Sequence, residues 1–258
     1  MKNFLLAILC ICSLFFACNP NSNEENTSQD DLFQSDTNVQ IQDTLLKATV
    51  DTIKITEDVI LFPDTYRIFN HMELKGKLAG RKWQEIYKKD NNYYVDKANY
   101  SLSEIEEDPC SGFPAQIIES SNNALLLFSI PNIKPGKLDT VAFSETIIQA
   151  GKSFEFSYNK HNYTLKASGI SFFSENGHTP NGTYNLVLFS DQYPEGHRII
   201  TQSEYNDTCT ELLMISDLDK DGFPDFIFSS PRDYEEERYL IILSSSNQIY
   251  EGNRQFDC

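Results

Sequence analysis

The stretch "ELLMISDLDKDGFPDFIFSS", residues 211–230, decides the fold and carries the clearest chemical signature of the chain. Two apolar runs, 212–215 and 226–228, flank a loop crowded with acidic residues. Short apolar runs bounded by Asp, Gly and Pro are typical of buried strands. The sequence therefore predicts a β-hairpin whose turn presents acidic side chains.

Carboxylates occupy alternate positions of this loop, and Gly222 follows the third of them. Alternate carboxylates on a tightly turning loop can converge on one point, and calcium prefers six to eight hard oxygen ligands. Gly222 permits the turn because glycine tolerates a positive φ. The predicted ligands of a calcium ion are Asp217, Asp219, Asp221, the backbone carbonyl of Phe223, and Asp225. The alternative is an Asp- and Gly-rich turn without a metal, since these residues favour turns in any case.

The twelfth position of the loop separates two classes of calcium site. An EF-hand needs a bidentate Glu there, whereas this chain has Phe228 between predicted strands. The pattern Asp-x-Asp-x-Asp-Gly-x-x-Asp between two strands instead resembles the calcium loops of FG-GAP and VCBS-type repeats. The wider C-terminal sequence is similar to small Bacteroidetes surface lipoproteins of unknown function with one such loop. Only one copy of the loop occurs, so no repeat propeller is inferred.

The amino terminus, "MKNFLLAILCICSLFFACNP", has the form of a secretory signal peptide over residues 1–17. Its apolar run is shorter than the roughly 20 residues that cross a bilayer. The junction before Cys18 resembles the bacterial lipobox, which implies acylation of Cys18 and a lipid anchor in the membrane. The adjacent Glu24 and Glu25 resemble a surface-export signal. We expect a surface-exposed lipoprotein of the bacterial outer membrane; secretion with an unmodified Cys18 is the alternative.

The net charge limits the classes of partner, and the cysteine count limits the possible disulfides. The formal charge of −17 argues against a nucleic-acid partner. If the signal peptide is removed and Cys18 is acylated, Cys110, Cys209 and Cys258 remain in an oxidising compartment. One disulfide and one spare thiol follow from this odd count. We predict a pair between Cys110 and Cys209, although the sequence leaves the other pairings open.

The composition divides the chain into four segments. A signal peptide (1–17) precedes a flexible acidic tether (18–58), a small β-rich unit (59–107) and a β domain (108–258) with the calcium hairpin. In the small unit we predict a hairpin over 83–95 and a short helix within 101–107. The fold class is mainly β, with an antiparallel sandwich or barrel-like C-terminal domain. Its nine predicted strands are 124–130, 139–145, 152–158, 162–169, 183–190, 197–203, 211–216, 225–230 and 238–246.

Nothing in the sequence marks a catalytic centre, because it contains no nucleophile elbow, phosphate loop or paired metal-ligand histidines. The function we predict is a lipid-anchored binding module for a glycan or protein ligand, with a structural calcium ion. Recognition loops are expected around Tyr193 and Tyr234, the latter beside the acidic triplet 235–237. The aromatic residues near Trp83 are either a sugar platform or a core face. The alternative function is a surface hydrolase of glycans or peptides, whose acid–base pair would be defined only in space.

Overall fold

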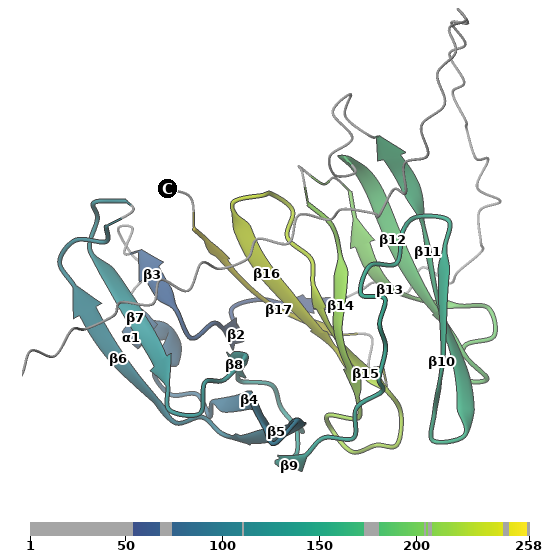
Figure 1. Ribbon diagram of the computed structural model, residues 1–258, viewed down its shortest axis with the longest axis horizontal. Helices are drawn as coiled ribbons and strands as arrows, with labels where there is room; N and C mark the ends of the chain where they lie inside the picture. Colours follow the sequence, from purple (N-terminus) through teal and green to yellow (C-terminus); the bar gives the residue numbers. More distant parts are fainter. Residues whose placement is uncertain are drawn as a thin grey trace, which may run out of the picture.

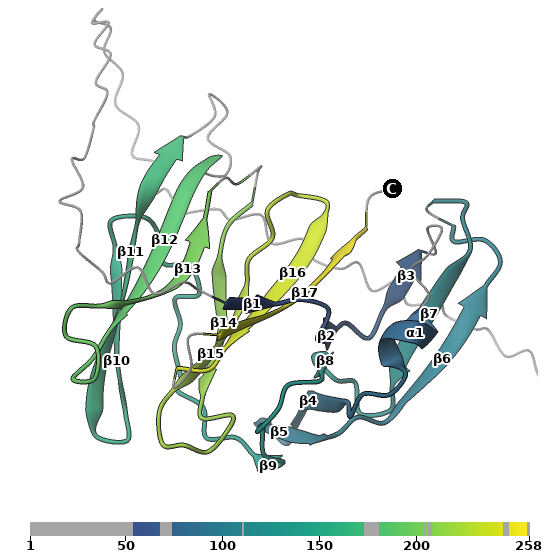
Figure 2. The same cartoon turned by 180° about the vertical axis from the view of Figure 1, so that it is seen from behind.

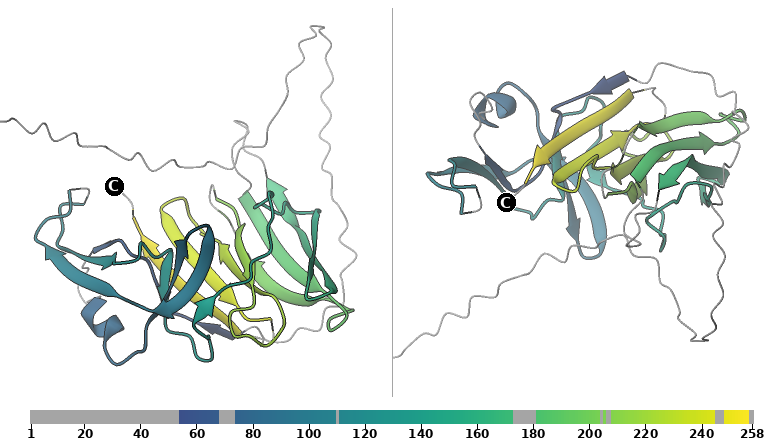
Figure 3. Two further views of the ribbon diagram at one scale, coloured as in Figure 1. Left: turned by 60° about the horizontal axis from the view of Figure 1, so that its bottom comes forward. Right: turned by 90° about the horizontal axis from the view of Figure 1, so that it is seen from above.

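The computed structural model describes residues 54–67, 74–109, 111–172, 181–203, 205, 208–244 and 248–256. The described chain is mainly β, with strands in four sheets and one short helix, α1, over Leu74–Leu78. Figure 1 shows the sheets following one another across the molecule, and Figure 3 shows the same order from two further sides. Within the described residues, no helix has the length and apolar character needed to cross a membrane.

The central sheet has the strand order β1-β17-β16-β15-β14. β1 pairs with β17 in parallel, and the remaining neighbours are antiparallel. Figure 2 shows β1 lying along β17 at one edge of the sheet. Its strands are β1 (Lys54–Thr56), β14 (Glu211–Ser216), β15 (Asp225–Ser229), β16 (Glu236–Ile242) and β17 (Gln248–Gln255).

Both faces of this sheet are covered, which explains why β14, β15 and β16 contain uninterrupted apolar runs instead of alternating residues. Phe226 and Phe228 of β15 point into one core, whereas Ile227 between them belongs to a second core on the opposite face. Leu240 and Ile241 of β16 divide in the same way. Successive side chains of a strand point to opposite faces, so an uninterrupted apolar run requires a covering layer on each side.

The first core lies between the central sheet and an antiparallel sheet of order β10-β11-β12-β13. Alternate residues of this outer sheet face inward, for example Phe156 and Tyr158 on β10 and Leu186 and Leu188 on β12. These two sheets form the predicted antiparallel sandwich. The outer strands are β10 (Ser153–Tyr158), β11 (His161–Phe172), β12 (Asn181–Phe189) and β13 (His197–Gln202).

The second core lies between the other face of the central sheet and a sheet of order β2-β8-β4-β5-β9. The predicted hairpin is confirmed as β4 and β5, joined at Asp90 and Asn91, which both have positive φ as a two-residue turn requires. The fourth sheet, of order β3-β7-β6, together with α1 and Trp83, covers the far side of the β2-β8-β4-β5-β9 sheet. The strands are β2 (Ile60–Leu61), β3 (Thr65–Arg67), β4 (Gln84–Lys89), β5 (Asn92–Lys97), β6 (Tyr100–Ile105), β7 (Ala115–Ser120), β8 (Leu126–Phe128) and β9 (Gly136–Lys137).

Three details of the fold differ from expectation. The predicted helix within 101–107 is wrong, because residues 101–105 belong to β6, in which the partly buried Tyr100 and Leu102 alternate with exposed residues. The segment 139–145 forms only an isolated bridge, at Thr140. The predicted boundary between residues 107 and 108 does not match the sheets, since β6 pairs with β7 across it and β8 and β9 join the strands that precede it. The pairing of strands is not visible in the composition of the sequence. A change in composition therefore could not locate the boundary between the sheets.

Gly252 provides a direct test of how the central sheet meets its neighbour. A Cβ at this position would lie 2.2 Å from the backbone oxygen of Ile60, so the close approach of β17 to β2 requires glycine. We expect Gly252→Ala to lower the free energy of unfolding by about 1–3 kcal/mol, as overpacking typically does. Gly76→Ala is the matched control, since nothing lies within 4 Å of its added Cβ and it sits in α1. Equal stability of the two variants in urea unfolding would contradict the assigned contact.

Candidate metal centre

The β14–β15 loop brings together three of the predicted ligands. One carboxylate oxygen from each of Asp217, Asp219 and Asp225 lies within 4.8 Å of the others. The loop connects two strands, as predicted, and Gly222 adopts a φ of 95°. Figure 1 shows this loop at the end of the central sheet, between β9 and β10. All the side-chain donors are hard carboxylate oxygens, which suit calcium or magnesium better than the softer metals.

Backbone amides shape the loop around these carboxylates. Asp217 accepts hydrogen bonds from the amides of Asp221 and Gly222, at 3.0 and 2.9 Å. The Asp221 amide also lies 3.2 Å from Oδ1 of Asp219. Such short-range bonds from Asp to the following backbone are the usual means by which this residue stabilises a turn. They orient the acidic side chains toward one side of the loop.

Asp225 is the buried member of the group, with 1 % of its surface exposed. Its Oδ2 accepts a bond from the amide of Leu218 at 2.7 Å, and its Oδ1 accepts one from the amide of Ser244 at 2.9 Å. Burial is the main cause that raises the pKa of Asp225, to about 8, and the nearby charges of Asp219 and Asp221 raise it further. The two amide hydrogen bonds act in the opposite direction. An ionised Asp225 therefore lacks sufficient positive charge in its surroundings.

The loop also contacts the layers on both sides of the central sheet. On one side, the amide of Lys134 donates to the Leu218 carbonyl at 3.2 Å, and Nζ of Lys220 donates to the Pro135 carbonyl at 3.0 Å. On the other, Nδ2 of Asn159 in the β10–β11 turn donates to the Gly222 carbonyl at 2.8 Å. The candidate metal centre thus lies where three sheets meet.

The remaining predicted ligands occupy less central positions. Asp221 is exposed and is not part of the converging group; its Oδ1 accepts a bond from the amide of Phe223 at 2.8 Å. Phe223 is half-buried.

The sequence did not reveal the part played by Ser244, whose amide donates a hydrogen bond to Asp225 and whose hydroxyl is buried without a hydrogen-bond partner in the described chain. Only the pairing of distant strands brings Ser244 to this place.

The predicted recognition loops are tied into the fold. The hydroxyl of Tyr193 donates to the Ser244 carbonyl at 2.8 Å, and its ring stacks on His197. The acidic triplet 235–237 takes part in ion pairs: Glu236 is buried against the Arg232 guanidinium, and Glu237 lies 2.6 Å from Arg254. Tyr234 remains exposed. Most of this surface is therefore engaged in internal contacts.

A second buried acidic group lies between the central sheet and β13. Nη2 of Arg238 donates to Glu251 at 2.8 Å, and Arg232 bridges Glu236 and Glu251. Each of these carboxylates is balanced by a guanidinium. This arrangement joins β16, β17 and the loop before β16, and we describe it as a structural ion-pair network.

The cysteine predictions are only partly within the described residues. Cys209 is disulfide-bonded. Cys110, its predicted partner, lies outside the described residues, as do Cys258 and the predicted lipidation site Cys18. The pairing of Cys110 with Cys209 therefore stays a prediction.

No protein-family model, curated protein or solved structure matches this chain.

The buried Asp225 predicts an unusual pH dependence for the metal-free chain. Because its folded pKa of about 8 lies above the ordinary value of 3.8, the folded state keeps a proton that the unfolded state loses. Stability should therefore fall as pH rises from about 4 to about 8, by at most about 1.4 kcal/mol per pH unit. Urea unfolding in chelator between pH 5 and 8 measures this slope.

Asp225→Asn is the matched variant, because it keeps the shape and one acceptor oxygen but cannot ionise. Its unfolding free energy should vary less with pH than that of the wild type over the same range. Parallel pH profiles for the two chains would show that Asp225 does not titrate as its burial requires.

Proposed function

We propose that this chain is a calcium-stabilised binding protein held to the bacterial outer membrane by a lipid anchor. The observation that carries the calcium site is the convergence of three carboxylates, one of which belongs to the buried Asp225. Two like charges 4 Å apart repel by about 1 kcal/mol in water and by about 4 kcal/mol at an effective dielectric constant of 20. A divalent cation removes this repulsion and supplies the positive charge that Asp225 lacks.

The donor set fits calcium. Asp217, Asp219 and Asp225 would hold the ion by their side chains, and the loop motif adds Asp221 and the Phe223 carbonyl. Calcium accepts many oxygen ligands in flexible geometry, whereas magnesium usually retains several waters. A site of clustered carboxylates on an acidic loop therefore favours calcium.

Bound calcium would stabilise more than the hairpin. The loop that carries the ligands also bonds to Lys134 and Pro135 on one side and to Asn159 on the other. Fixing the loop therefore fixes the contacts between neighbouring layers. A ligand that binds only the folded state stabilises it in proportion to the logarithm of its free concentration over Kd. We accordingly assign the ion a structural role in support of a binding surface.

Calcium titration tests this site on the soluble chain from residue 19 onward, which lacks the signal peptide and the acylated Cys18 and is used as the mature chain. At calcium one hundred times above Kd, about 2.7 kcal/mol of added stability should raise Tm by roughly 5–10 °C. Asp219→Ala should remove most of this shift, because it deletes a converging ligand. Asp221→Ala should weaken it less, since Asp221 is exposed and outside the converging group. Differential scanning calorimetry in chelator and in calcium measures both.

Glu155→Ala is the control for charge, because it removes one exposed acidic group from β10, outside the loop. Its calcium-dependent shift should equal that of the wild type. A chain whose Tm does not respond to millimolar calcium, or variants that all respond alike, would overturn the calcium site.

The proposed anchor is supported by the lipobox-like junction before Cys18 and by the acidic residues that follow it. Two or three acyl chains give stable membrane attachment, since each buried methylene contributes about 0.8 kcal/mol. A folded part from β1 onward would then be joined to the membrane by the polar stretch between Cys18 and residue 54. Such a tether places a binding surface outside the lipid headgroups.

Cys18→Ala tests the anchor in cells expressing the full chain. Metabolic labelling with an alkyne fatty acid should mark the wild type and Cys12→Ala but not Cys18→Ala, and Cys18→Ala should leave the membrane fraction. Labelling that persists in Cys18→Ala would contradict lipidation at this cysteine. Protease treatment of intact cells reports separately whether the anchored chain faces outward.

A further inference from the structure

Positive charge is concentrated in one part of this acidic protein. Residues 74–100 contain seven lysine or arginine residues and only three acidic ones, whereas the whole chain carries −17. This segment forms α1 and the hairpin of β4 and β5. At physiological ionic strength the field of distant charges is largely screened beyond about 8 Å. The electrostatic attraction of a ligand to this segment therefore depends on the local cations and not on the net charge of the chain.

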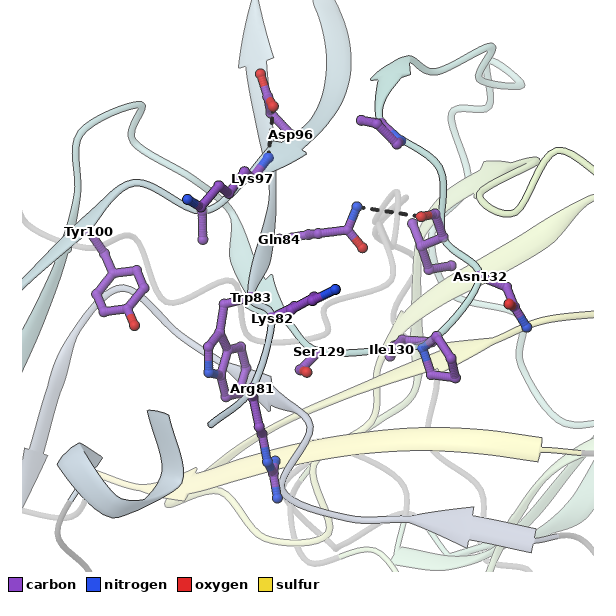
Figure 4. A pocket seen from close by; sticks show the side chains of 14 residues that line it. Arg81, Lys82, Trp83, Gln84, Asp96, Lys97, Tyr100, Ser129, Ile130 and Asn132 are labelled. Atoms are coloured by element: carbon purple, nitrogen blue, oxygen red, sulfur yellow. Dashed lines mark hydrogen bonds between the residues drawn. The ribbon is translucent and has the colours of Figure 1, made fainter. Parts of the chain in front are cut away.

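The basic segment lines an open groove with a volume of about 960 Å³. The start of β4 and the end of β5 form one wall, and residues 129–135 form the other. Figure 4 shows Lys82 and Gln84 extending from the hairpin side toward the wall that contains Ile130 and Asn132, whereas Lys97 points to the side of Tyr100. Its volume lies at the upper end of the range of small-molecule sites, so the groove accommodates several linked small units.

Three cations and one carboxylate line the groove. Arg81 is held in place by a hydrogen bond to the Asp58 carbonyl and by the face of Trp83, 6.0 Å away. Lys82 and Lys97 are exposed, and no ion pair occupies either ammonium within the described part of the chain. The carboxylate of Asp96 accepts a bond from the Lys97 amide at 2.7 Å. The groove therefore offers an excess of unneutralised positive charge.

Neutral hydrogen-bonding groups lie among these cations. Gln84, Asn132, Ser129 and the phenol of Tyr100 line the groove, and Nε2 of Gln84 donates to the Ile133 carbonyl at 3.4 Å. Amides and hydroxyls can both donate and accept, which suits a ligand rich in hydroxyl groups. The combination of cations with such groups matches the chemistry of an acidic sugar chain.

Two features disfavour a peptide occupant. Peptides commonly add as a strand to an open sheet edge, but β4 is paired with β8 at the groove, and β9 covers Tyr94 and Val95 of β5 and leaves only the end of that strand without a neighbour from β9. Protein partners commonly use an exposed aromatic anchor, but Trp83 has only 5 % of its surface exposed and donates through Nε1 to the Leu78 carbonyl at 3.1 Å. Trp83 is consequently a core residue that supports the groove and not a stacking platform.

We infer that this groove binds a short acidic oligosaccharide that bears carboxylate or sulfate groups. The cations contact the anionic groups of the sugar, and the amides and hydroxyls contact its hydroxyl groups. This inference rests on the proposed function as a binding protein and names the ligand class. It does not depend on the identity of the metal.

Isothermal titration calorimetry of the mature chain in calcium tests the inference with two tetrasaccharides. A chondroitin sulfate tetrasaccharide should bind, and neutral maltotetraose should bind at least tenfold more weakly. Lys82→Glu with Lys97→Glu should weaken the acidic sugar at least tenfold. Lys88→Glu with Lys89→Glu makes the same change in charge at the far end of the hairpin, outside the groove, and should alter affinity less than twofold.

The outcomes separate this inference from the proposed calcium site. Failure to bind the acidic tetrasaccharide, by a chain whose Tm still rises with calcium, overturns the groove inference alone. The inference is also overturned if both double lysine variants lose the same amount of affinity for the acidic tetrasaccharide. Equal affinity of the wild type for the neutral and the acidic tetrasaccharide would overturn it as well. Binding to phosphatidylglycerol vesicles through Lys82 and Lys97, without binding to the sugar, would instead assign the groove to lipid headgroups. An unchanged calcium response in both lysine variants verifies that they are folded.

Discussion

The apolar character of the central strands is the constraint on which the rest of the structure depends. A sheet whose successive residues Phe226, Ile227 and Phe228 are all buried cannot leave either face in water. One face is covered by the sheet of β10 to β13 and the other by the sheet that contains β4 and β5. The second of these is in turn covered by α1 and β3, β6 and β7. The layered order thus follows from the need to bury consecutive apolar residues.

Because both faces are covered, backbone amides of the polar β14–β15 loop and of Ser244 are buried at the end of the central sheet and need hydrogen-bond acceptors. The carboxylate of Asp225 accepts the hydrogen bonds of two of them, the amides of Leu218 and Ser244. The same carboxylate then lies close to Asp217 and Asp219 in surroundings that oppose its ionisation. A loop organised in this way would gain stability from the proposed cation, and without a cation it would gain stability from a proton on Asp225.

Sequence patterns located most strands but did not show which strands pair with each other. The runs at 211–216 and 225–230 contain β14 and β15, and the run at 238–246 overlaps β16, because apolar runs between turn residues are a local signal. The short strands β2 and β9 each have two residues, too few for any period to show. Likewise, alternate spacing identified Asp217, Asp219 and Asp225, whereas Ser244 joins them through the order of the strands. The groove was not foreseen, since its walls come from two separate segments of the chain, within residues 81–100 and 129–135.

The metal centre and the groove share a structural element, which gives their combination a physical meaning. Residues 129–135 form one wall of the groove, and the Asp loop binds this segment through Lys134 and Pro135. Calcium bound at the proposed site would order the loop and reduce the freedom of this wall, so that the proposed sugar would lose less entropy on binding. Linkage would then require the sugar to strengthen calcium binding by the same factor. A surface protein built in this way would hold its groove most firmly where calcium is plentiful, outside the cell.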